Sequence, residues 1–112
     1  MKFEKLNNLT TTTSQIVPDI EIIETTETEL EPLYRVIIHN DDITPMDFVV
    51  HVLKTIFYLS NPKAAEIMLA AHFYGNAYVQ TLTRSEAENR IDKAHFAATA
   101  EGFPLHFSME PE

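Results

Sequence analysis

The chain has 112 residues, which is enough for one domain with a modest hydrophobic core. It contains no cysteine, which excludes disulfides and thiolate metal sites, and its formal net charge of -9 argues against nucleic acids and anionic membranes as partners. No apolar run is long enough to cross a bilayer, and the first residues resemble neither a secretory signal nor a transit peptide. We therefore expect a cytosolic protein, although a mature organellar protein has the same features.

Residues 1–32 differ in composition from the rest of the chain. They carry seven acidic and two basic residues, a run of four threonines at Thr10–Thr13, and no lasting amphipathic pattern. This composition predicts a flexible acidic extension. Two interpretations are open for it, an inert tail or a segment that a partner protein holds.

The first regular elements are a strand and an amphipathic helix. Leu33–His39 is rich in β-branched and aromatic residues, so we predict a strand with one buried face. From Met46 the apolar residues recur with the spacing i, i+3, i+4, i+7, which predicts a helix that ends near Leu59. Its core stripe consists of Met46, Val49, Val50, Leu53, Ile56 and Phe57.

A second helix and a second strand follow. Asn61-Pro62 reads as an N-cap followed by proline in the first turn, and Gly75 is the expected C-terminal stop of this helix. The alternation in residues 77–82 then predicts a strand.

The last third of the chain predicts a long helix and a final strand. Thr83 and Glu86 form a capping-box pattern, and Gly102 closes a helix that runs to about Glu101. A strand over 105–109 completes the order β-α-α-β-α-β. We expect an α+β fold in which a small three-stranded antiparallel sheet is covered by three helices, with a core domain at 33–112. The inward residues expected on the long helix are Ala87, Ile91, Ala94 and Ala98.

The connection between the first strand and the first helix is unusually rich in acceptors. Asn40, Asp41 and Asp42 all have side-chain oxygens that bond nearby backbone N–H groups in turns, and Thr44-Pro45 reads as an N-cap and a first helical residue. A well-built strand-to-helix turn is one interpretation. Two adjacent carboxylates exceed what capping needs, and this excess favours a cationic ligand.

A second constellation combines this turn with the second helix. If the helix packs beside the strand end, the side chains of Asn40, Asp41 and His72 converge and can hold a primary ammonium, which has three donors and no acceptor. Met46 and Met68 begin two core stripes nearby and suit a cavity for apolar groups of several shapes. A free N-terminal residue of a peptide has both features. The plainer interpretation of His72 is a helix-end histidine that suits the helix dipole.

Other kinds of site are less well supported. His39, Asp41, Asp42 and His72 are possible metal ligands, but their spacing matches no zinc pattern. A G-x-S-x-G elbow and a phosphate-binding loop are both missing, so hydrolysis is disfavoured. A further alternative is an interaction module without an N-terminal-residue pocket, which binds a partner protein through its acidic face.

The sequence from about Leu33 to Met109 resembles the ClpS adaptor family over some two-thirds of the chain. The Asn-Asp-Asp-Ile-Thr-Pro-Met run together with a downstream Met-Leu-Ala-Ala-His is highly specific for that family. The matching segments are Tyr34–Ile38, Asn40–Val49, Ile67–His72 and Pro104–Leu105.

This resemblance implies a monomeric, non-enzymatic adaptor without cofactor or metal, in a bacterial cytoplasm or a plastid stroma. Such an adaptor recognises proteins whose N-terminal residue is Leu, Phe, Tyr or Trp (an N-degron) and passes them to a Clp AAA+ unfoldase. It implies α-ammonium binding by Asn40, Asp41 and His72. It implies a hydrophobic pocket made by Ile38, Thr44, Met46, Val49, Met68, Ala71 and Leu105, with Asp42, Ile43 and Pro45 also lining it.

The resemblance also implies how the partner binds. The unfoldase N-domain, of the ClpA or ClpC type, docks around Ser85 and Arg90, and the unfoldase engages the N-terminal extension during delivery. Three positions depart from the family pattern. Ala71 stands where valine is usual, His39 where an aliphatic residue is common, and Ser85 where the family has glutamate.

Overall fold

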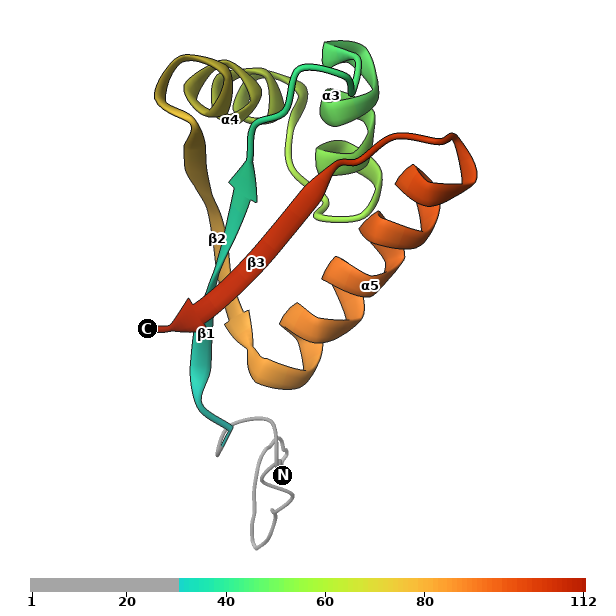
Figure 1. Ribbon diagram of the computed structural model, residues 1–112. Helices are drawn as coiled ribbons and strands as arrows, with labels where there is room; N and C mark the ends of the chain where they lie inside the picture. The colour runs from blue at the N-terminus through green and yellow to red at the C-terminus, as the bar shows by residue number, and fades with distance from the viewer. Residues whose placement is uncertain (1–30) are drawn as a thin grey trace, which may run out of the picture. The chain divides into compact units, whose positions relative to one another are not determined.

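A computed structural model describes residues 31–112, so the predicted acidic extension lies outside the described residues except for its last two positions. The described elements follow the predicted order β-α-α-β-α-β and confirm the α+β class (Figure 1). Their bounds are β1 (Leu33–His39), α3 (Met46–Thr55), α4 (Asn61–Tyr74), β2 (Asn76–Thr83), α5 (Arg84–Ala100) and β3 (His106–Pro111).

The three strands form one antiparallel sheet in the order β2-β1-β3. The central strand β1 pairs Ile38 with Ala77 on one side and with Phe107 on the other, and a bulge shifts the β1–β2 register between Val36 and Ile37. Helices α3 and α4 gather near the carboxyl end of β1, whereas α5 runs beside the lower part of the strands (Figure 1). The turn after β1 therefore meets the ends of two helices.

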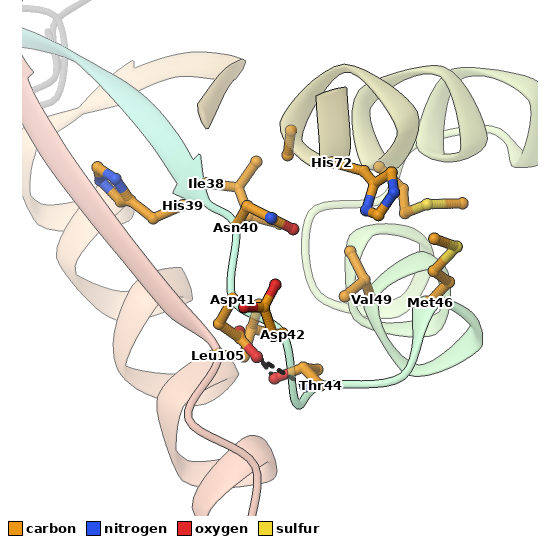
Figure 2. A pocket seen from close by; sticks show the side chains of 12 residues that line it. Ile38, His39, Asn40, Asp41, Asp42, Thr44, Met46, Val49, His72 and Leu105 are labelled. Carbon is orange, nitrogen blue, oxygen red and sulfur yellow. Dashed lines mark hydrogen bonds between the residues drawn. The ribbon is translucent and has the colours of Figure 1, made fainter. Parts of the chain in front are cut away.

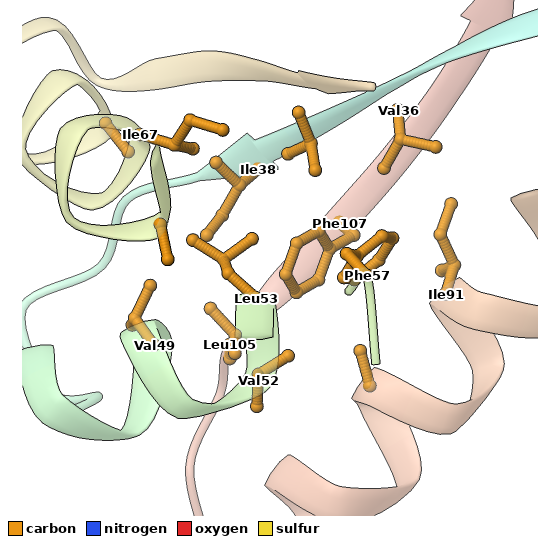
Figure 3. Packing of buried hydrophobic residues seen from close by; sticks show 14 of the residues in the cluster. Val36, Ile38, Val49, Val52, Leu53, Phe57, Ile67, Ile91, Leu105 and Phe107 are labelled. Carbon is orange, nitrogen blue, oxygen red and sulfur yellow. The ribbon is translucent and has the colours of Figure 1, made fainter. Parts of the chain in front are cut away.

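The hydrophobic core lies between the sheet and the helices. Val36, Ile38, Leu53 and Phe107 are at most 1% exposed, and the rings of Phe57 and Phe107 stack with centroids 5.0 Å apart (Figure 3). Each such side chain contributes about 1.5–3 kcal/mol through burial. The predicted inward face of α5 is confirmed, since its four expected residues are all buried: Ala87, Ile91, Ala94 and Ala98.

Two helix ends differ from the prediction. Helix α3 ends at Thr55 instead of near Leu59, and Tyr58 adopts a left-handed backbone conformation (φ 57°) that a continuing helix does not allow. Helix α4 is capped by Ser60, whose side chain accepts from Lys63 N, so the cap lies one residue before the predicted Asn61. Serine and asparagine are about equally good caps, which is why composition did not separate them.

Two capping predictions are corrected in part. Thr44 is not the N-cap of α3, because its hydroxyl donates to Asp41 and Pro45 occupies the cap position without a side-chain bond. Thr83 does cap α5 by accepting from Glu86 N. The Glu86 carboxylate accepts from Arg90 Nε at 2.8 Å instead of reaching back to the cap. Within 31–112, no helix has the length and apolarity needed to cross a membrane.

Candidate functional site

A cavity of about 170 Å³ lies where the turn after β1, the start of α3, the last turns of α4 and the approach to β3 meet (Figure 2). These four segments are far apart in the sequence, and the sheet and helix packing brings them together. The cavity is lined by Ile38, His39, Asn40, Asp41, Asp42, Thr44, Met46, Val49, Met68, Ala71, His72 and Leu105.

The deeper wall of the cavity is apolar. Ile38, Val49, Ala71 and Leu105 are each at most 9% exposed, whereas Met46 is 46% exposed. The cavity volume of about 170 Å³ slightly exceeds the ~150 Å³ of an engineered protein cavity that binds benzene. The space therefore suits one large aliphatic or aromatic side chain, and the flexible methionines allow its shape to vary.

The polar side of the cavity carries three side chains that are free to bind a ligand. The Asn40 amide and the Asp42 carboxylate point toward the space that the His72 imidazole also faces (Figure 2). None of these three side chains has a hydrogen-bond partner within residues 31–112, and the lining contains neither lysine nor arginine. An amide oxygen, a carboxylate and an imidazole nitrogen together favour a ligand that is cationic and rich in donors.

The neighbouring Asp41 has a different role within the turn. One carboxylate oxygen accepts from Ile43 N (2.8 Å) and Thr44 N (2.7 Å), and the other accepts from the Thr44 hydroxyl (2.9 Å). Burial raises the pKa of Asp41, but the donated bonds from Thr44 and Ile43 outweigh burial and leave the pKa below its ordinary 3.8. Asp41 is therefore ionised at neutral pH and holds the turn in shape.

The residues predicted for the site are mostly brought together. Asn40, Asp41 and His72 all line the cavity, and so do Asp42 and the seven residues predicted for the hydrophobic pocket: Ile38, Thr44, Met46, Val49, Met68, Ala71 and Leu105. Their roles in ligand binding stay predictions.

Two residues predicted to line the cavity do not. Ile43 is 68% exposed, because the tight turn around Asp41 directs its side chain outward. Pro45 lies instead at a separate open depression beside Phe48 and Phe103. Sequence order alone does not reveal which residues of a tight turn face inward.

One lining residue was missed by sequence reasoning. His39 contributes to the cavity wall, although its ring points away from the cavity, and its Nε2 lies 2.7 Å from Ser108 Oγ (Figure 2). Its position directly before Asn40 at the end of β1 was the available signal.

The predicted docking residues Ser85 and Arg90 lie on α5, away from the cavity lining. The Arg90 guanidinium is engaged internally: it donates to Glu86 at 2.8 Å and to Gln80 at 3.0 Å, and it lies 4.9 Å from the ring centroid of Tyr58. Within the described residues, no three histidine, aspartate or glutamate side chains come close enough to hold a metal ion.

Comparison with known proteins agrees with this architecture. Residues 29–108 match the family model described as "ATP-dependent Clp protease adaptor protein ClpS". The ClpS of Desulfatibacillum aliphaticivorans is 44% identical over 84% of this chain and 90% of its own length. ClpS 2 of Mesorhizobium japonicum is 46% identical over 77% of this chain and 85% of its own.

A solved structure also resembles this chain. It is Agrobacterium tumefaciens ClpS2 bound to L-phenylalaninamide, which is 40% identical, covers 73% of this chain and 99% of its own, and superposes with a TM-score of 0.71. The family model spans well over half of the chain, and the relatives match along most of their lengths. The chain therefore belongs to the ClpS family, the adaptor proteins of the ATP-dependent Clp protease.

Proposed function

We propose that this adaptor binds proteins with a bulky hydrophobic N-terminal residue (Leu, Phe, Tyr or Trp) and delivers them to a Clp AAA+ unfoldase for degradation. The observation that carries this proposal is the cavity of about 170 Å³, in which an apolar wall meets a polar rim. The rim consists of Asn40, Asp42 and His72, whose side chains have no hydrogen-bond partner within residues 31–112. An N-terminal residue presents an apolar side chain and an ammonium on the same carbon atom, so both parts of the cavity are used at once.

The α-ammonium is assigned to the polar rim. In this proposal, Asn40 and His72 accept its hydrogens from opposite sides. Asp41, which also holds the turn, is the acidic partner predicted for the ammonium, and the Asp42 carboxylate, which points toward the same space, adds further negative charge. The solved relative supports this assignment, because the L-phenylalaninamide bound to Agrobacterium tumefaciens ClpS2 has a free α-amine and an aromatic side chain.

The energetics favour capture followed by release. Hydrogen bonds to a charged group contribute about 1.5–3 kcal/mol each, and burial of one large apolar side chain adds roughly the same amount. After the cost of association is subtracted, an affinity on the order of micromolar is expected. An internal phenylalanine lacks the ammonium and therefore loses the polar part of this binding energy.

We further propose how the adaptor acts with its partner. It works as a monomer in a bacterial cytoplasm (or a plastid stroma) and has no catalytic role, cofactor or metal of its own. The N-domain of a ClpA-type or ClpC-type unfoldase docks around Ser85 and Arg90, and residues 1–32 are engaged during delivery. The bacterial relatives, which are adaptors of the same protease, support this assignment.

The test compares two peptides that differ only at the N-terminus. A Phe-initiated peptide with a free amine is titrated against its acetylated form, which has lost the charge and two of the donors. We expect acetylation to weaken binding by about tenfold or more, which corresponds to the loss of at least one charged hydrogen bond. Equal affinity for both peptides, or binding of neither, would contradict the proposal.

A further inference from the structure

The connection between α4 and β2 is a single residue. Helix α4 ends at Tyr74, β2 begins at Asn76, and Gly75 alone reverses the chain with φ 93° and ψ -26°. This is a conformation that side chains with a Cβ atom rarely adopt and that glycine adopts freely. Apart from Gly75 and its chain neighbours, no atom of the described residues lies within 4 Å of the place where a Cβ would stand, so the backbone conformation, not lack of space, makes glycine suitable here.

Gly75 also makes a hydrogen bond that joins the two halves of the polar rim. Its carbonyl accepts from the backbone N–H of Asn40 at 2.9 Å, just beyond the last paired residues of β1 and β2. Asn40 carries the amide of the rim, and His72 lies three residues before Gly75 in the last turn of α4. One residue and one hydrogen bond therefore link the backbone of Asn40 directly to the end of the helix that carries His72.

We infer that Gly75 is a positioning residue for α-amine recognition: its left-handed backbone directs its carbonyl to Asn40 and so sets the geometry between the Asn40 amide and the His72 imidazole. This inference rests on the proposed function of the cavity. An alanine at this position favours negative φ, which turns the carbonyl away from Asn40 N–H. The Asn40 amide and the His72 imidazole then lose their spacing, while Val49 and Leu105, which line the apolar wall from other segments, keep their places.

The second glycine of the chain provides a matched control. Gly102 follows the end of α5 and also has a positive φ (79°), and the described residues beyond its chain neighbours place no atom within 4 Å of its Cβ position. Gly102→Ala therefore introduces the same kind of backbone strain at a helix end that carries no polar rim residue. Gly75→Asn provides the rescue, because asparagine tolerates this turn conformation better than alanine does.

The experiment measures amine discrimination, which is the ratio of the Kd for N-acetyl-L-phenylalaninamide to the Kd for L-phenylalaninamide. We expect Gly75→Ala to lower this ratio about tenfold, as for loss of one charged hydrogen bond. Gly102→Ala should leave the ratio unchanged, although it should lose a similar amount of stability in urea. Gly75→Asn should retain most of the wild-type ratio. An unchanged ratio in Gly75→Ala, or an equal loss in Gly102→Ala, would overturn the inference.

A second measurement separates this inference from the proposed function. If the wild-type protein does not discriminate between the two amides, the proposed function fails. Hydrogen exchange at the Asn40 backbone N–H then decides the inference, since the Gly75 carbonyl is its acceptor. We expect protection in the wild type and in Gly75→Asn, and loss of protection in Gly75→Ala. Retained protection in Gly75→Ala would show that the hydrogen bond between Asn40 N–H and the carbonyl of residue 75 does not depend on glycine, and would overturn the inference.

Discussion

At the scale of single residues, two adjacent carboxylates have different surroundings. Asp41 accepts three hydrogen bonds from Ile43 and Thr44, whereas Asp42 has no partner within residues 31–112 and faces the cavity. Both are acidic and lie next to each other, so sequence alone assigned the ammonium to Asp41 and gave Asp42 a lesser role. The hydrogen bonds account for the shape of the turn, and the role of each carboxylate in ammonium binding stays a prediction.

The different surroundings of the two carboxylates predict different effects for two alanine variants. Asp41→Ala removes the acceptor for three donors and should lower the free energy of unfolding by roughly 1–3 kcal/mol. Asp42→Ala should change it by no more than about 0.5 kcal/mol but weaken binding of L-phenylalaninamide about tenfold. Urea denaturation and calorimetric titration measure the two quantities. Equal effects of both variants on stability would show that the turn does not depend on Asp41.

At the scale of elements, the sequence predicted the existence and the order of the helices and strands well. It predicted where the helices begin and end less well. Strand β1 was predicted from its composition and alternation, and α5 from the capping pattern and the glycine that mark its ends; both were predicted to within a residue or so. The caps were harder, because side chains compete for the same donors. The Thr44 hydroxyl has two plausible partners, the start of α3 or Asp41, and only the folded turn decides between them.

Helix α5 and strand β3 meet at a histidine whose protonation should affect stability. His95 Nε2 accepts from Phe107 N at 2.9 Å, and its ring stacks on His106 with centroids 5.3 Å apart. Burial, together with the charge of His106, lowers the pKa of His95 below 6.5 despite an opposing effect of Asp92. A proton on Nε2 would also remove the acceptor for Phe107 N–H.

The sign of the pH dependence follows from this direction. Because the folded-state pKa is lower than the unfolded value of 6.5, the unfolded chain binds the proton first. The stabilisation is fully present above pH 6.5 and is lost as the pH falls from 6.5 toward the lowered value. Urea denaturation should therefore show falling stability over that range. His95→Gln, which keeps an acceptor but does not titrate, should flatten the dependence, and the exposed control His51→Gln should retain it. A wild-type-like slope in His95→Gln would contradict the assignment.

At the scale of the whole molecule, the candidate site depends on the order of the strands. Asn40 and His72 lie 32 positions apart, and the central place of β1 brings the end of that strand against the last turn of α4. The residue types predicted an ammonium site only on the condition that these two ends meet. The resemblance to a known family supplied that condition, while periodicity supplied only the elements. The exact lining, including His39 and excluding Ile43, required the folded turn.

At the same scale, the proposed function predicts that binding and delivery depend on different parts of the chain. Every described residue that lines the cavity lies between Ile38 and Leu105, so deletion of residues 1–25 should leave the Kd for L-phenylalaninamide unchanged. Degradation of a Phe-initiated reporter protein by a Clp unfoldase and its peptidase with ATP should slow by on the order of tenfold, because a second tethered contact raises the effective concentration of the complex. A chain with residues 1–25 in shuffled order is the control for composition. If the shuffled chain supports normal degradation of the reporter, delivery depends on the length and charge of this segment. Unchanged degradation after the deletion would show that the segment is inert.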